Sequence, residues 1–130
     1  MAKIDHLDMG AQLKASGKIE VKKGFLGIGS KIIYKPTGSV VRIKENEYSA
    51  EDGKRLETIL AADPDNIGEA IGQNPVAAAG IGKTKLQACL SADRQFAAVQ
   101  LLVFKDFDFS PLTGVKMYEG SAAEAIAQLF

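Results

Sequence analysis

Apolar residues in the first third of the chain alternate with polar ones, and glycine or proline separates the alternating segments. Residues 19–22, 31–34 and 39–43 have the alternation or the β-branched content of strands, and a Pro-Thr-Gly turn signal lies between the last two. This pattern predicts a meander of three strands. Residues 1–17 fit a frayed helix, or an extended and mobile lead-in.

The period then changes to that of a helix. Leu56, Ile59 and Leu60 form an apolar stripe, which predicts a helix that begins after Ser49 and ends before an Asp-Pro pair at residues 63–64. Ser49 has an aspartate three residues later, an approximate capping box. We expect a second short helix at residues 65–72, followed by an Ala/Gly-rich connector.

The second half carries the strongest strand patterns. Residues 83–90 and 95–109 predict two strands joined by a four-residue hairpin connection, and residues 115–118 predict another. Ser121, with Glu124 three residues on, forms a capping box that predicts a C-terminal helix.

These elements predict a single α+β domain over residues 1–130, with about six mainly antiparallel strands and two to three short helices. The turn segments at residues 34–38 and 109–114 resemble each other, and each is followed by a strand and a Ser-capped helix. A β-β-β-α duplication explains this repetition, and so does chance. The strand order stays open between a sandwich or barrel capped by a helix and an open sheet with helices on one face.

Composition narrows the class of protein. With 130 residues, 46% hydrophobic and 25% charged, the chain resembles an ordinary globular domain. Its 16 basic and 16 acidic residues give zero net charge, which argues against a nucleic-acid binder. One cysteine excludes an intramolecular disulfide, no secretory signal is visible, and residues 96–104, the longest apolar run, are too few to cross a bilayer. We therefore expect a cytoplasmic protein.

The charges are unevenly distributed along the chain. Residues 1–44 hold nine Lys or Arg against three acids, whereas residues 45–80 hold two against eight. Such blocks face each other across a fold or a symmetric dimer, or the first forms a basic surface for an anionic ligand.

A glycine-rich segment at residues 24–29 is the leading candidate site. Its apolar side chains lie between lysines, as in loops that contact an anionic ligand or a membrane surface. The alternative is that these apolar side chains fold back onto the core. The candidate ligand-binding residues are Lys22, Lys23, Phe25, Leu26, Ile28 and Lys31.

Residues 77–84 match a degenerate form of the phosphate-binding P-loop, with alanine in place of its first glycine. In a true P-loop, Gly82 and its neighbours would cradle phosphates, Lys83 would reach their oxygens and Thr84 would bind Mg²⁺. That loop needs a strand before it and a helix after it, whereas residues 83–90 have a strand pattern. Nucleotide binding is therefore the alternative function.

Two further features carry little chemistry. Asp106 and Asp108 would share one face of a strand and offer two carboxylates for a cation or for acid–base work, but no histidine is near them. Cys89 alternates with apolar neighbours, which predicts partial exposure, and His6 is the only histidine that could activate it. One Cys and one His cannot build a zinc site, so we expect no metal and no cofactor.

The best interpretation is a non-catalytic binding or interaction domain that uses the glycine-flanked loop. A homo-oligomer, in which exposed strand edges pair between copies, is compatible with it.

Overall fold

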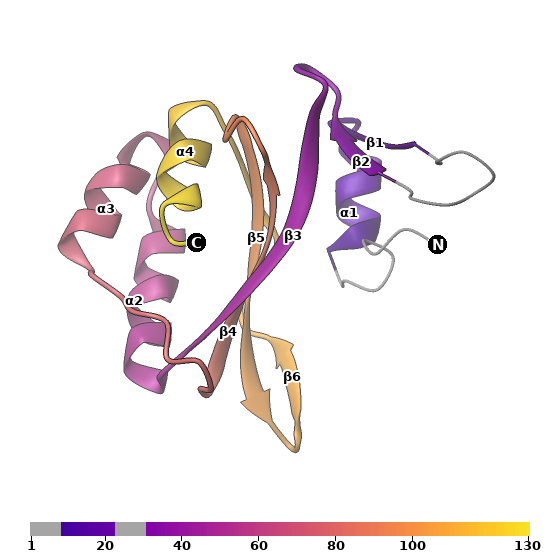
Figure 1. The fold of residues 1–130 in the computed structure, drawn as a ribbon. Coiled ribbons are helices and arrows are strands. Elements are labelled where there is room, and N and C mark those ends of the chain that lie inside the picture. The colour runs from indigo at the N-terminus through magenta and orange to yellow at the C-terminus, as the bar shows by residue number, and fades with distance from the viewer. Residues whose placement is uncertain (1–8, 23–30) are drawn as a thin grey trace.

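One antiparallel sheet runs through the computed structural model, which describes residues 9–22 and 31–130 (Figure 1). Its strands are β1 (Ile19–Lys22), β2 (Lys31–Tyr34), β3 (Ser39–Tyr48), β4 (Thr84–Ser91), β5 (Phe96–Lys105), β6 (Asp108–Pro111) and β7 (Lys116–Glu119). The helices are α1 (Gly10–Ala15), α2 (Ala50–Ala61), α3 (Ile67–Gln73) and α4 (Ser121–Ala127), with a short 3-10 helix, η3 (Pro64–Asn66), before α3. The predicted α+β class with its C-terminal helix is confirmed.

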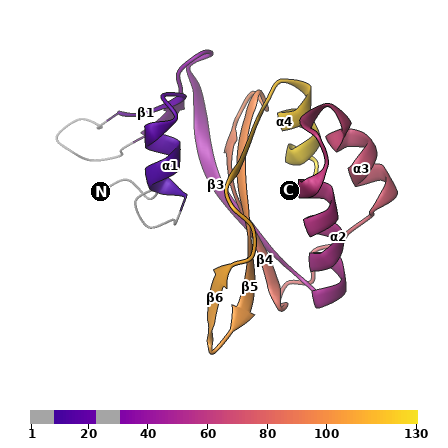
Figure 2. The ribbon, with the colours of Figure 1, turned by 180° about the vertical axis from the view of Figure 1, so that it is seen from behind.

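The sheet is open, with the order β1-β2-β3-β4-β5-β6. Strand β7 pairs with the first half of β5, next to the place where β6 pairs with the second half. Every pairing is antiparallel. The open-sheet alternative is therefore the observed one, although helices cover both faces rather than one (Figure 2).

The larger core lies between the sheet and helices α2, α3 and α4. The predicted stripe on α2 is buried, and it packs with Ile67 of α3 and Ile126 of α4 against the sheet. The sheet contributes Leu86, Val99 and Leu101, all fully buried. Such burial stabilises by about 1.5–3 kcal/mol per large aliphatic side chain.

A second core lies under α1 on the opposite face. Met9 and Leu13 are fully buried there against Ile32, Val41 and Phe96 of the sheet. Of the two conformations left open for residues 1–17, residues 10–15 adopt the helical one. Figure 1 shows α1 beside β1 and β2, so the far end of this face, at the β5–β6 hairpin, has no helix over it.

The two predicted serine caps have different outcomes. Ser49 caps α2, because its hydroxyl accepts the N–H of Asp52. Ser121 is instead the first residue of α4, and the cap position belongs to Gly120, which makes no side-chain cap hydrogen bond. Gly120 has φ 67°, and its N–H donates to the carbonyl of Gln95. A sharp turn after β7 therefore replaces the capping box.

The strand predicted over residues 95–109 is wrong, because the chain reverses inside it. Strand β5 ends at Lys105, and β6 begins at Asp108. Asp106 and Phe107 form a two-residue turn with φ of 54° and 66°. The usual signal for this turn is Asn-Gly or Asp-Gly, and Asp-Phe does not provide it. With the extra strand, and with β7 returning to β5, the second half of the chain pairs differently from the first.

Candidate interaction site

The glycine-rich loop lies largely outside the described residues, and this holds for Lys23, Phe25, Leu26 and Ile28. Lys22 and Lys31 are described. They are exposed and face each other in register, at the end of β1 and the start of β2. Binding through this loop therefore stays a prediction.

The β5–β6 hairpin is the most exposed apolar feature of the described residues. It projects beyond the ends of the neighbouring strands (Figure 1). Phe107 lies in its turn with 96% of its surface exposed. A bulky residue with positive φ is uncommon and costs free energy, on the order of 1–3 kcal/mol. Because Phe107 is so exposed, its side chain gains little packing against the described residues to offset this cost.

A hollow of about 470 Å³ lies at the base of the hairpin. It is bounded by the end of β3, the start of α2, the segment before β4, and the hairpin itself. Its lining residues are Glu47, Ser49, Ala50, Ile81, Gly82, Lys83, Phe104 and Phe109. Ile81 is 89% exposed, so a large apolar side chain stands open to solvent at the rim. Pockets with apolar walls and a few polar groups are the usual binding sites of proteins.

Two phenylalanines form one wall of the hollow. Phe104 and Phe109 pair across β5 and β6, with ring centroids 5.3 Å apart and an edge-to-face arrangement. Lysines lie over both rings. The Nζ of Lys83 is 5.4 Å from the Phe104 centroid, and the Nζ of Lys85 is 4.2 Å from the Phe109 centroid. These cation–π contacts hold the rings in place.

The charges at the hollow are mostly paired. The Nζ of Lys85 lies 3.8 Å from Oε1 of Glu45, and Oε1 of Glu47 accepts the N–H of Gly82 at 3.2 Å. Lys83 makes no ion pair with any described residue. Glu47 is half-buried and bonded to the backbone, whereas Lys83 is exposed, so the exposed charge of the lining is the cation of Lys83.

Gly82 fixes the segment before β4 against the end of β3. A Cβ atom at this position would lie 2.1 Å from the backbone oxygen of Tyr48, so only glycine allows this approach. Two residues later, the hydroxyl of Thr84 donates to the carbonyl oxygens of Tyr48 and Ser49, each at 3.1 Å. The position of Lys83 between them is thus set by the backbone.

The three P-loop candidates lie close together, but in a different context from a phosphate loop. Gly82 and Lys83 line the hollow, whereas Thr84 is buried and its hydroxyl is bonded to backbone. Residues 84–91 form strand β4, which agrees with the strand pattern, and no helix follows the lysine. The strand–loop–helix arrangement that presents N–H groups to phosphates is absent from this described segment.

Cys89 is fully buried, so the expectation of partial exposure is wrong. Its Sγ lies 3.8 Å from Sδ of Met9, because α1 covers this face of the sheet. Burial raises the pKa of the Cys89 thiol to about 12, which makes it a poor nucleophile at neutral pH. Asp106 and Asp108 do not share a strand face, since the turn separates them.

Ion pairs do not join the basic and acidic blocks of the sequence within the described residues. The three pairs there are Lys18–Glu119 at 3.0 Å, Arg55–Asp52 and Lys85–Glu45. In the same residues no three His, Cys, Asp or Glu side chains come together as metal ligands. No helix in this part of the chain is long and apolar enough to cross a membrane.

Sequence reasoning missed Ile81, Phe104, Phe107 and Phe109 as site residues. The alternation of acids and aromatics at residues 106–109 suggested a strand with one wet and one dry face. The available signal was the density of phenylalanine, three in six residues from 104 to 109, beside charged residues. Compared with known proteins, the chain matches no family model, no curated protein and no solved structure.

Proposed function

We propose that this chain is a non-catalytic interaction domain that associates with a second copy of itself through the β5–β6 hairpin. The observation that carries the proposal is the pairing of an exposed aromatic side chain, Phe107, with an unfilled apolar hollow on the same chain. Exposed aromatic residues are typical anchors of protein interfaces, and they bind best in preformed pockets.

Charge complementarity selects the occupant. Phe107 lies between Asp106 and Asp108, which are exposed and make no ion pair with a described residue. The hollow offers Lys83 as its exposed charge, since Glu47 is half-buried and accepts the N–H of Gly82. An aromatic side chain between two carboxylates thus matches apolar walls beside a lysine, and the chain itself carries both halves of this match.

A twofold axis satisfies both halves at once. In such a contact the hairpin tip of each copy enters the hollow of the other. Each copy therefore inserts one tip and receives one tip. The hairpin carries the tip and also forms one wall of the hollow. The two contacts are therefore adjacent, and the interface is contiguous.

Insertion of side chains fits this edge of the sheet better than pairing of strands between copies. Strand β6 is the last in the sheet order and ends with Pro111. Proline has no N–H to donate to a further strand, and edge strands commonly use it to prevent such pairing.

The contact should be weak. An aromatic residue buries about 150–250 Å², and full burial of a Phe side chain contributes about 1.5–3 kcal/mol. Two such insertions work against the entropy of association, so we expect a dissociation constant in the micromolar to millimolar range, about −8 to −4 kcal/mol.

We also propose that the chain is cytoplasmic and, as stated above, non-catalytic. Both proposals are supported by Cys89, a free thiol that is buried and therefore unsuited to nucleophilic work. A free thiol persists most readily in a reducing compartment.

Sedimentation equilibrium from about 10 µM to about 1 mM, the range of the expected dissociation constant, tests the proposal. We expect a reversible rise in mass toward a dimer, which Phe107→Ala removes. Leu112→Ala is the matched control, because Leu112 is also exposed and apolar but does not line the hollow. A wild-type chain that stays monomeric, or a Phe107→Ala chain that dimerises equally, would overturn the proposal.

A further inference from the structure

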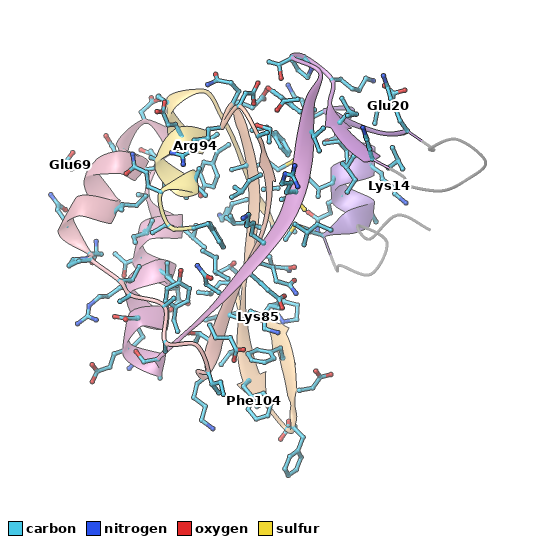
Figure 3. The ribbon with its side chains drawn as sticks, in the orientation of Figure 1. Lys14, Glu20, Glu69, Lys85, Arg94 and Phe104 are labelled. Atoms are coloured by element: carbon cyan, nitrogen blue, oxygen red, sulfur yellow. The ribbon has the colours of Figure 1, made fainter. Side chains whose placement is uncertain are left out.

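A second hollow, of about 150 Å³, lies on the face of the sheet that carries α4. Its lining residues are Arg42, Lys44, Leu90, Ser91, Ala92, Arg94, Ala127 and Phe130. Three of them have cationic side chains and none has an acidic side chain. The hairpin site is distant, since Figure 3 shows Arg94 beside α4 and Phe104 at the opposite end of the sheet.

Two of the cations come from one strand. Arg42 and Lys44 are two residues apart on β3, so their side chains leave the same face of the sheet. They stand opposite Leu90 and Ala88 of β4, which belong to the core under the helices. In antiparallel strands, directly opposed residues share a face. The two cations therefore point toward the helix side of the sheet, next to the end of α4.

The third cation is held in place by an uncommon backbone conformation. Arg94 lies in the loop between β4 and β5 with φ 60°, and its N–H donates to the carbonyl of Ser91. A left-handed conformation at a residue other than glycine costs free energy, and such strain collects at functional positions. Here it places a guanidinium group at the rim of the hollow.

None of the three cations forms an ion pair with a described residue. Asp93, which precedes Arg94 in the chain, is engaged elsewhere. Its Oδ1 accepts the hydroxyl of Ser91 at 2.6 Å and the N–H of Gln95 at 3.1 Å. Like charges gathered around one hollow repel each other, and an anion between them removes that cost.

Capping of α4 does not account for these cations either. Cations near a helix end commonly serve its last carbonyl groups. In α4, the carbonyls of Ala125, Ile126 and Ala127 accept the N–H groups of the three residues that follow the helix. The carbonyl of Leu129 accepts the side-chain amide of Asn46. The carbonyl groups at this helix end are therefore already bonded.

We propose that this hollow binds a phosphate group, held by Arg42, Lys44 and Arg94. Guanidinium groups bind tetrahedral oxyanions through two parallel hydrogen bonds, and a doubly charged phosphate balances three cations better than a carboxylate does. The volume of about 150 Å³ accommodates one phosphate group. Two sources share this chemistry: free inorganic phosphate and a phosphate monoester on a larger molecule.

Titration of the ¹⁵N-labelled chain, followed by amide chemical shifts, tests this site. The probes are inorganic phosphate and N-acetyl-phosphoserine amide, each against potassium chloride at equal ionic strength. We expect saturable shifts centred on Arg42, Lys44, Ala92 and Arg94 that chloride does not reproduce. If only inorganic phosphate saturates the site, the ligand is free phosphate. If the monoester binds as tightly or more tightly, the ligand is an esterified phosphate.

Variants separate a site from general attraction between ions. Arg42→Gln and Arg94→Gln should each weaken binding at least about ten-fold, the effect of losing one charge-assisted contact. Lys54→Gln removes an exposed cation on α2, away from the hollow, and should leave binding unchanged. Arg42→Gln keeps the test valid if Arg94→Gln alters the strained loop. Shifts equal to those in chloride, shifts centred elsewhere, or equal weakening by all three variants would overturn the site.

Discussion

The Nζ of Lys85 on β4 lies 4.2 Å from the ring centre of Phe109 on β6, although β4 and β6 do not pair with each other. The lysine side chain crosses β5 to make this contact. Because Glu45 also lies near the Lys85 ammonium group, β3, β4 and β6 are linked by one side chain on this face. The base of the projecting hairpin is thereby fastened to the sheet, which leaves its tip presented on a rigid support.

Packing of α2 on the sheet depends on a glycine. A Cβ atom at Gly53 would lie 2.4 Å from Cγ2 of Thr84, a buried side chain. We expect Gly53→Ala to destabilise the fold by about 1–3 kcal/mol, as overpacked cores do. Urea denaturation measures this cost.

Gly72 provides the matched control, since it also lies in a helix but its Cβ would meet nothing within 4 Å. Gly72→Ala should stabilise by about 0.5–1 kcal/mol, because alanine favours the helix. If the two substitutions changed stability equally, helix propensity rather than the approach of α2 to Thr84 would determine the effect of Gly53→Ala.

A hydrogen-bonded cluster of Tyr34, Glu119 and Lys18 makes the stability of the fold depend on pH. The carboxylate of Glu119 on β7 accepts the hydroxyl of Tyr34 on β2 and pairs with the ammonium group of Lys18 at 3.0 Å. The hydrogen bond from Tyr34, and then that from Lys18, lowers the pKa of Glu119. Burial, followed by the bond to Glu119, raises the pKa of Tyr34 from 10.0 to about 12.

The signs of the two effects follow from linkage. Glu119 ionises more readily in the folded state, so its contribution is present above the unfolded pKa of 4.5 and is lost as pH falls through the folded value. Tyr34 ionises less readily in the folded state, so its contribution is lost as pH rises from 10.0 to about 12. Between these ranges both contributions are complete.

Tyr34→Phe should therefore flatten the acid limb of a stability profile measured by urea denaturation from about pH 7 to 3. Tyr118→Phe is the control, because the Tyr118 hydroxyl is buried and has no hydrogen-bond partner. It should leave the acid limb unchanged. If the wild type and Tyr34→Phe lost stability in parallel, the bond to Glu119 would not be the source.

Local pattern was sufficient to predict most elements, but not the site. The alternation at residues 19–43 and the stripe on α2 depend on short-range periodicity, and both appear in the fold. Strand β3 continues to Tyr48, beyond the predicted end at residue 43, because residues 44–48 remain paired with residues 84–88 of β4 although most of them are polar. The turn at Phe107 has no sequence signal of its own, and the hollow depends on the meeting of residues 47–50, 81–83 and 104–109, three segments that are far apart in sequence.

Nucleotide binding through Gly82, Lys83 and Thr84 is open to a direct test. Because β4 begins at Thr84 and its hydroxyl is bonded to the backbone, we expect no heat of binding for ATP or GTP with Mg²⁺ at millimolar concentration. Isothermal titration calorimetry measures this. Saturable heat that Lys83→Gln removes would contradict this account of the loop.

Charge exchange between two variants tests the hairpin contact most directly. Lys83→Glu puts a carboxylate in the hollow, facing the carboxylates of the tip, and Asp108→Lys puts an ammonium group beside Phe107, facing Lys83 of the hollow. Asp108 is chosen over Asp106 because it lies in β6, outside the positive-φ turn. Each variant alone then brings like charges together, whereas a mixed pair brings opposite charges together at both contacts.

The measurement is the mass by sedimentation velocity of each variant alone and of their equimolar mixture, at a concentration where the wild type dimerises. The account predicts monomers for each variant alone and a heterodimer in the mixture. A mixture that stays monomeric beside a dimeric wild type, or variants that dimerise alone as the wild type does, would contradict insertion of Phe107 into the hollow beside Lys83.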